Sequence, residues 1–192
     1  MARPSMAGQR REEILDALEI CILEKGIQAT SLEHLADTAK MKRTILRHYI
    51  GNRDEIICAL SARWSEKYNQ QWQDTLSWLP NKYRADALID ILFSSRSTEH
   101  INNTIIGEAL FSEAKRLPEI KSDQEKIMAE FNRHLTSVLT SQFSVAPADN
   151  VELVAAGIYA NYLMSESLLP LGLMDEVLKL KKSTLLLMST LQ

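Results

Sequence analysis

The stretch AKMKRTILRHYIGNR, residues 39–53, contains five basic side chains and no acidic one. The lysine and arginine residues are Lys40, Lys42, Arg43, Arg47 and Arg53. They lie in a chain of 192 residues whose formal net charge is -3. A segment of this kind is either a solvated basic face or a surface that meets an anionic partner. The elements on either side of it decide between these interpretations and also decide the fold.

An amphipathic helix is predicted over residues 9–25, before the basic stretch. Ile14, Leu18 and Ile22 lie on one face at the helical period, with charged residues opposite. Gly26 follows at the position where a left-handed cap ends a helix. This first helix therefore has an apolar face to pack against the segment that follows.

Two short helices and the start of a long one are predicted next. Thr30 and Glu33 match a capping box for a short helix that carries Leu35 and Ala36. After a turn of three or four residues, a second short helix is expected at about 42–49. Asn52 and Glu55 then form the cap of a long helix that continues through Trp72. This is helix-turn-helix geometry, in which the second short helix enters the major groove of DNA.

The remainder of the chain is also predicted to be helical. Helices are expected near 84–95, 99–116, 119–143, 147–168 and 172–190, with prolines at their ends. No segment shows sustained alternation of apolar and polar residues, so no sheet is expected. The fold class is therefore all-α, with about nine helices.

Composition excludes several classes of protein. The two cysteines are not paired at metal-site or redox spacing, and no uncharged apolar run is long enough to span a bilayer. The first residues lack the apolar core of a signal peptide. A cytoplasmic protein without membrane contact is expected. The nucleotide-binding, hydrolase and zinc-protease motifs are missing, so we expect no catalytic residues, no metal and no cofactor.

The segment EKGIQATSLEHLADTAKMKRTILRHYIGNRDEII, residues 24–57, resembles the DNA-binding domain of the tetracycline-repressor (TetR) family. The matching positions are Gly26, Thr30-Ser31, Leu35-Ala36, residues 46–50 and residues 53–56. The resemblance implies a DNA-binding domain at 1–51 and a ligand-binding and dimerisation domain at 52–192. It also implies a ligand-responsive regulator, more specifically a repressor, that binds a palindromic operator as a homodimer and is released by a small molecule. The later part of the chain is weakly similar to the family's choline-responsive betaine branch.

The sequence departs from the family pattern at several positions. Lys40 stands where the turn usually has glycine, and a left-handed backbone there would cost roughly 1 kcal/mol. Lys42 replaces the usual serine cap, and Thr44 replaces a small residue. Arg47 replaces a tyrosine and Ile50 a phenylalanine. The base sequence that is read cannot therefore be transferred from the family.

Nine residues are expected at DNA. Arg43 and Thr44 are placed to read base edges, since arginine pairs with guanine and the threonine methyl contacts thymine. Arg47, His48, Tyr49 and Arg53 are expected to hold phosphates. The alternatives are that Arg43 and Thr44 contact only phosphate or water, and that His48 is exposed and makes no contact with DNA. The full set is Thr30, Ser31, Lys42, Arg43, Thr44, Arg47, His48, Tyr49 and Arg53.

The last two predicted helices carry more apolar surface than one core contact requires. They contain VELVAAGIYANYLMSESL (151–168) and MDEVLKLKKSTLLLMSTL (174–191), each apolar on more than one stripe. Paired across a two-fold axis, they would form a four-helix bundle between two copies of the chain. A solely intramolecular core is the alternative.

A small-molecule site is expected among aromatic residues of the larger domain. An aromatic cage with Glu166 would hold a cation, although most residues of an aromatic stripe are simply core. The candidate residues are Trp64, Tyr68, Trp72, Phe93, Phe111, Asn161, Tyr162 and Glu166. The competing functions are a helical-bundle enzyme and a protein-interaction module with a vestigial helix-turn-helix.

Overall fold

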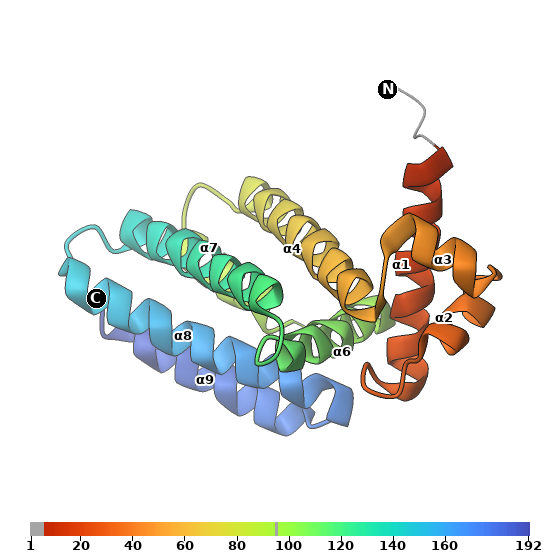
Figure 1. The fold of residues 1–192 in the computed structure, drawn as a ribbon. Coiled ribbons are helices and arrows are strands. Elements are labelled where there is room, and N and C mark those ends of the chain that lie inside the picture. The colour runs from red at the N-terminus through yellow and green to blue at the C-terminus, as the bar shows by residue number, and fades with distance from the viewer. Residues whose placement is uncertain (1–5, 95) are drawn as a thin grey trace. The chain divides into compact units, whose positions relative to one another are not determined.

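A computed structural model describes residues 6–94 and 96–192 (Figure 1). Over these residues the chain is helical and contains no strand, which confirms the all-α prediction. The elements are α1 (Met6–Lys25), α2 (Leu32–Thr38), α3 (Arg43–Ile50), α4 (Arg53–Trp78), α5 (Arg84–Leu92), α6 (Thr98–Glu113), α7 (Pro118–Gln142), α8 (Ala148–Leu168), the 3-10 turn η1 (Leu169–Leu171) and α9 (Met174–Ser189).

The chain divides into two compact units. The first unit runs up to Lys67 and includes Ile105–Gln124, and the second comprises Tyr68–Thr104 and Glu125–Gln192. Helices α4, α6 and α7 each contribute residues to both units. This division follows packing and differs from the expected boundary between residues 51 and 52. The functional division into 1–51 and 52–192 stays a prediction.

The core of the first unit forms where α1, α2 and α3 pack on one another. The predicted apolar face of α1 is buried, and Leu35 of α2 and Leu46 of α3 are buried against it. Gly26 ends α1 with a φ of 77°, and its N–H donates to Ile22 O at 2.8 Å. The glycine cap expected from the sequence is therefore confirmed.

The cap of α2 lies one residue later than predicted. Ser31 is the N-cap, and its hydroxyl accepts a hydrogen bond from the His34 N–H at 3.1 Å. Thr30 is buried, and its hydroxyl donates to Gly26 O at 3.0 Å. The predicted Thr30–Glu33 capping box is wrong because the threonine hydroxyl closes the preceding turn instead.

The turn between α2 and α3 contains Lys40 in the left-handed conformation, with a φ of 52°. The Met41 N–H donates to Ala36 O at 2.9 Å, the 6→1 bond of a Schellman motif. Lysine thus occupies the position of that motif that usually holds glycine. The expected left-handed strain of roughly 1 kcal/mol applies to this structure.

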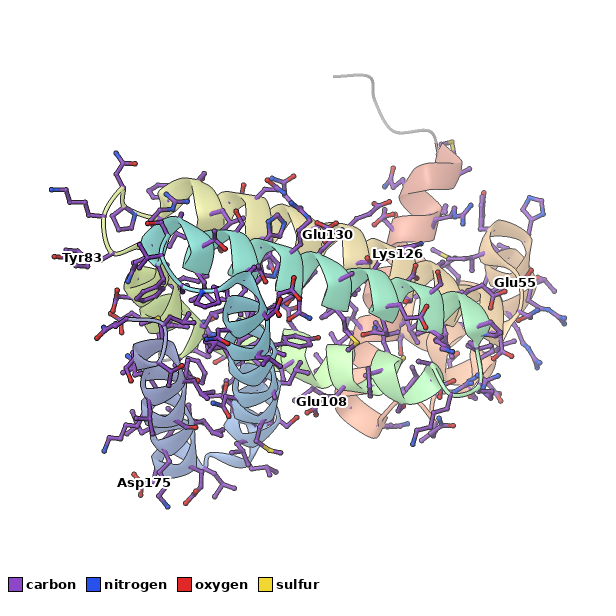
Figure 2. The ribbon with its side chains drawn as sticks, turned by 90° about the vertical axis from the view of Figure 1, so that its left-hand side faces the viewer. Glu55, Tyr83, Glu108, Lys126, Glu130 and Asp175 are labelled. Carbon is purple, nitrogen blue, oxygen red and sulfur yellow. The ribbon has the colours of Figure 1, made fainter. Side chains whose placement is uncertain are left out.

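The core of the second unit combines aliphatic side chains with a group of aromatic ones that includes Phe131 of α7, which is fully buried. Within this unit α8 and α9 lie side by side (Figure 1). They approach closely at Gly157, where an added Cβ would lie 2.9 Å from Leu187 Cδ1. The connection from α4 to α5 is exposed, and Tyr83 projects from it into solvent with a positive φ (Figure 2).

None of the described helices has the length and apolar character needed to cross a membrane.

Candidate functional site

The outward face of α3 carries most of the residues predicted to contact DNA. Leu46 and Ile50 anchor the helix in the core, which turns Arg43, Thr44 and Arg47 outward. Lys42 and His48 are exposed beside them. Within the described part of the chain, Lys42, Arg43 and Arg47 form no ion pair, so their charges are available to an external anion.

The other predicted DNA residues are placed less uniformly. Ser31 is exposed at the start of α2. Tyr49 is half-buried, with its ring edge-on to His48 at a centroid distance of 5.3 Å. Thr30 is buried and its hydroxyl is already bonded, so its side chain is not presented at the surface.

The start of α4 satisfies its own backbone groups. Asn52 Oδ1 accepts from the N–H groups of Asp54 at 2.8 Å and Glu55 at 3.1 Å. Glu55 Oε2 accepts from the Asn52 N–H at 2.7 Å. This confirms the predicted cap. It also means that the N–H groups of Asp54 and Glu55 are bonded within the protein and are not free to meet a phosphate.

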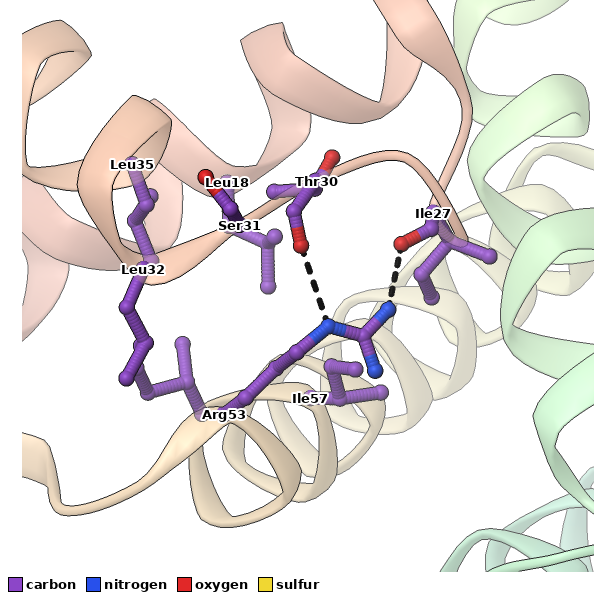
Figure 3. Close-up of a pocket in the computed structure, with 9 residues that line it drawn as sticks. Leu18, Ile27, Thr30, Ser31, Leu32, Leu35, Arg53 and Ile57 are labelled. Atoms are coloured by element: carbon purple, nitrogen blue, oxygen red, sulfur yellow. Dashed lines mark hydrogen bonds between the residues drawn. The ribbon is translucent and has the colours of Figure 1, made fainter.

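Arg53 points towards the segment between α1 and α2. Its Nε donates to Thr30 O at 3.0 Å, and its Nη2 donates to Ile27 O at 2.5 Å (Figure 3). The side chain also lines a small hollow with Ile27 and Ile57. The volume of this hollow, about 10 Å³, is at the lower limit for a single water molecule.

The eight predicted effector residues fall into both units. Trp64 and Phe111 belong to the first unit, where Trp64 packs on Gly107 and Phe111 is 56% exposed. The other six belong to the second unit: Tyr68, Trp72, Phe93, Asn161, Tyr162 and Glu166.

Four of these six contribute to a connected aromatic cluster in the second unit. Trp72 meets Phe131 edge-on at 4.8 Å, and Phe131 stacks on Tyr162 at 5.2 Å. Tyr68 is edge-on to Trp72, and Phe93 is edge-on to Tyr162, both at 6.5 Å. Burial raises the pKa of both Tyr68 and Tyr162, so these phenols stay neutral.

Glu166 is placed inside the second unit, with 13% of its side chain exposed. Its Oε2 accepts from His100 Nε2 at 2.6 Å and from the Thr104 hydroxyl at 2.8 Å, and Arg96 Nη2 lies 3.4 Å from Oε1. Burial by itself raises the pKa of Glu166, but the hydrogen bond from His100 and the charges of His100 and Arg96 outweigh it. The pKa is therefore lowered, and the side chain is a carboxylate at neutral pH.

Asn161 joins α8 to α9 and does not lie in the aromatic cluster. Its Nδ2 donates to Thr184 Oγ1 at 3.1 Å and is 3.3 Å from Ser183 Oγ. Thr184 is fully buried between these helices. The polar group that the sequence suggested as a ligand contact therefore has protein partners.

An exposed apolar stripe runs along α8, the first of the two C-terminal helices. Leu153, Ala156, Ala160 and Leu163 recur at intervals of three or four residues, and all four are exposed. The outer face of α9 adds three exposed leucines, which are Leu178, Leu185 and Leu186. Each helix also buries a second face in the unit's own core. The prediction of two apolar stripes on each helix is thus confirmed.

Several residues of these sites were not identified from the sequence. Phe131 and Tyr159 complete the aromatic cluster, and their ring centroids are 4.5 Å apart. His134 stacks on Trp72, and its pKa is lowered by burial and by Arg133. The spacing of His100 and Thr104, four residues apart on one helix face, was the available signal for the partners of Glu166.

Comparison with known proteins gives a consistent result. No family model matches the chain. It is 25% identical over 163 residues to the HTH-type transcriptional regulator BetI of Rhizobium meliloti, covering 83% of this chain and 77% of that protein. A TetR transcription regulator from Haloarcula marismortui superposes with a TM-score of 0.79 over 95% of this chain and 97% of that one, at 14% identity. The chain therefore has the fold of TetR-type regulators and is similar in sequence to BetI.

Two further TetR-like structures are informative. The TetR regulator of Legionella pneumophila superposes with a TM-score of 0.71 at 18% identity, covering 96% of this chain and 97% of that one. A regulator from Saccharomonospora viridis, solved in complex with choline, gives a TM-score of 0.77 at 10% identity, with coverages of 92% and 93%. These neighbours share the TetR fold with this chain.

Proposed function

We propose that this chain is a transcriptional repressor of the TetR family that binds a palindromic operator as a homodimer and is released by a small molecule. The observation that carries the proposal is the exposed face of α3, where Arg43, Thr44 and Arg47 project from a helix anchored by Leu46 and Ile50. A short basic helix of this kind, the second of a helix-turn-helix, is suited to the major groove. The apolar stripes of α8 and α9 support the two-fold assembly that a palindrome requires.

The test of DNA binding begins with selection of duplexes from a random library by the purified full chain. The proposal expects enrichment of an inverted repeat whose half-site centres are about one helical turn apart, or a multiple of it. Affinity for the selected duplex should fall steeply with salt, since phosphate contacts release counterions. If no duplex is enriched at low salt, the regulator proposal fails and the protein-interaction module becomes the better account.

The small molecule is proposed to be a compact organic cation that binds beside Glu166 and the aromatic cluster. A buried carboxylate next to aromatic faces is a favourable environment for a quaternary ammonium group. Arg96 Nε is buried and has no acceptor among the described residues, so it can donate to an oxygen of the same ligand. A cation with a hydroxyl group, such as choline, satisfies both requirements, and a structural neighbour holds choline.

Comparison of choline with tetramethylammonium separates the contact of the cation with Glu166 and the aromatic cluster from the contact of the ligand oxygen with Arg96 Nε. Choline should quench or shift tryptophan fluorescence and should bind more tightly than tetramethylammonium, which lacks the oxygen. Glu166→Gln should weaken both cations, while Glu108→Gln, an exposed change on α6, should weaken neither. Choline should also lower operator affinity by about 5- to 150-fold, and operator should lower choline affinity by the same factor. Unchanged cation binding by Glu166→Gln would remove Glu166 from the site.

A further inference from the structure

Arg53 already donates hydrogen bonds within the protein, unlike an arginine that is free to bind a phosphate. Its guanidinium bridges the carbonyl oxygens of Ile27 and Thr30, and 30% of its side chain is exposed (Figure 3). Both carbonyls belong to the non-helical segment that connects α1 to α2. The bridge therefore ties the first residue of α4 to the segment that leads into the helix-turn-helix.

The neighbouring residue extends this contact to the end of α6. Asp54 accepts from Arg116 through both carboxylate oxygens, at 2.7 and 2.8 Å. Arg116 Nη2 also donates to Glu113 Oε2 at 2.6 Å, and Glu113 Oε1 accepts from the Gln28 amide. Because Gln28 lies between Ile27 and Thr30, the chain of contacts closes on itself. We name it the 53–116 ring, formed by Gln28, Arg53, Asp54, Glu113 and Arg116 within the first unit.

The ring is built with compensated charges. The side chain of Glu113 is only 1% exposed, and an isolated carboxylate at such a position would carry a large desolvation cost. Arg116 and Gln28 each use one of its oxygens. The hydrogen bonds from Arg116 lower the pKa of Asp54, which therefore stays ionised well below neutral pH. Two arginines and two acids thus balance one another across two separate segments of the chain, and the neutral amide of Gln28 connects them to a third.

The positive charge of Arg53 is also partly offset within the ring. Its Nη1 lies 3.8 Å from Asp54 Oδ1. Two of its other donor groups point at carbonyls, so a phosphate would have to displace existing bonds to engage the fork of the guanidinium. Arg47, in contrast, is exposed on α3 and has no ion pair among the described residues. The two arginines are therefore in different chemical environments.

We propose that Arg53 is a positioning residue, which with the 53–116 ring fixes the segment before α2 to α4 and α6 and so sets how α3 is presented to DNA. This inference rests on the proposed DNA-binding function and deepens it. The fork of arginine spans two carbonyls, whereas the single ammonium group of lysine cannot hold both in the same geometry. Lysine does, however, serve as a phosphate contact. An arginine-to-lysine change therefore separates the positioning role from the phosphate role.

The experiment compares lysine and glutamine variants at both arginines on the duplex selected by the wild type. Arg53→Lys should bind that operator about tenfold more weakly, like Arg53→Gln, because both lose the carbonyl bridge. Neither change should alter the slope of log affinity against log salt. Arg47→Lys should bind nearly as the wild type does, and Arg47→Gln should flatten the slope by about 0.9 for the lost phosphate. Affinity for scrambled duplex should fall less than operator affinity in the Arg53 variants.

Two further measurements separate positioning from loss of fold. Binding is measured well below the unfolding midpoint of each variant, and amide hydrogen exchange is followed in residues 26–31, which should exchange faster in Arg53→Lys. Arg116→Lys, at a half-exposed site of the same ring, should reproduce the loss of operator preference if Arg53→Lys fails to fold.

The outcomes are distinct. Operator binding by Arg53→Lys at the wild-type level, with a flattened salt slope in Arg53→Gln, would show a phosphate contact and overturn the positioning role. If the wild type selects no duplex, the regulator proposal fails and the positioning role fails with it.

Discussion

Replacement of Leu186 by glutamate should break the proposed dimer. Leu186 lies on the outer face of α9 and is 70% exposed in the single chain. Full burial of a leucine stabilises by about 1.5–3 kcal/mol, so burial of its exposed share contributes about 1–2 kcal/mol per copy. A two-fold axis brings each change into the interface twice, which gives about 2–4 kcal/mol per dimer. The dimer dissociation constant should therefore rise by about 30- to 1,000-fold, before any cost of burying the new carboxylates.

Sedimentation equilibrium over a wide range of protein concentration measures this constant directly. Trp78→Glu is the matched control, since it places the same charge on an apolar side chain of the second unit that is 84% exposed. The control should remain a dimer with the wild-type constant. If Leu186→Glu also dimerises as tightly as the wild type, the outer face of α9 is not at the interface. The four-helix arrangement would then be wrong.

Three other changes test separate parts of the structure. Arg43→Ala should weaken operator binding by roughly 1–3 kcal/mol and random duplex much less, relaxing one position in each half-site, as measured by titration of operator and scrambled DNA. Lys40→Gly should raise the free energy of unfolding by about 0.5–1 kcal/mol, because glycine removes the left-handed strain at a φ of 52°. Lys115→Gly, at an exposed turn without a positive φ, should not stabilise; equal urea midpoints for the two variants would contradict this explanation. Glu166 has a lowered pKa in the fold, so its contribution to stability is present above its ordinary pKa of 4.5 and is lost as pH falls through the folded value. Below about pH 4.5 the free energy of unfolding, measured in urea, should therefore fall less in Glu166→Gln than in the wild type. Identical dependences of this free energy on pH would refute the contribution of Glu166.

Local features of the fold were predictable because their causes are local. Helical periodicity located α1, Gly26 ended it, and Asn52 with Glu55 began α4, each through contacts between residues a few positions apart. The left-handed Lys40 followed from the turn geometry that the family resemblance implied. At α1, Gly26 and the start of α4 the nearby residue types are sufficient to specify the backbone, whereas lysine disfavours the left-handed conformation at position 40 and only the resemblance indicated it.

The cap of α2 shows where local rules become ambiguous. Thr30 and Ser31 both have the chemistry of a helix cap. The choice between them depended on Gly26 O, which accepts from the Thr30 hydroxyl, and on the burial of Thr30. Two adjacent candidates of similar propensity cannot be separated without knowing which one faces the core.

Long-range partners were not predictable from one sequence. Arg53 bonds to carbonyl oxygens, which every residue has and which leave no trace in the residue types. Glu166 is held by Arg96 and by residues of α6, more than sixty positions away in the chain. Phe111 was assigned to the aromatic stripe, but α6 turns it to the surface. Such contacts depend on how helices pack, and periodicity alone does not determine this.

The start of α3 has a consequence for the dynamics of the protein. Ser31 and Asn52 provide side-chain acceptors at the starts of α2 and α4, but Lys42 provides none to α3. A missing cap of this kind loosens the first turn of a helix by about 1 kcal/mol. The first turn of α3 carries Arg43 and Thr44, so the residues that would read the bases are the ones most readily frayed. On DNA, phosphate oxygens can accept from these open amides. If the proposed operator binding holds, we expect the first turn of α3 to become fully ordered only on DNA, and to adjust before that to the base pairs it encounters.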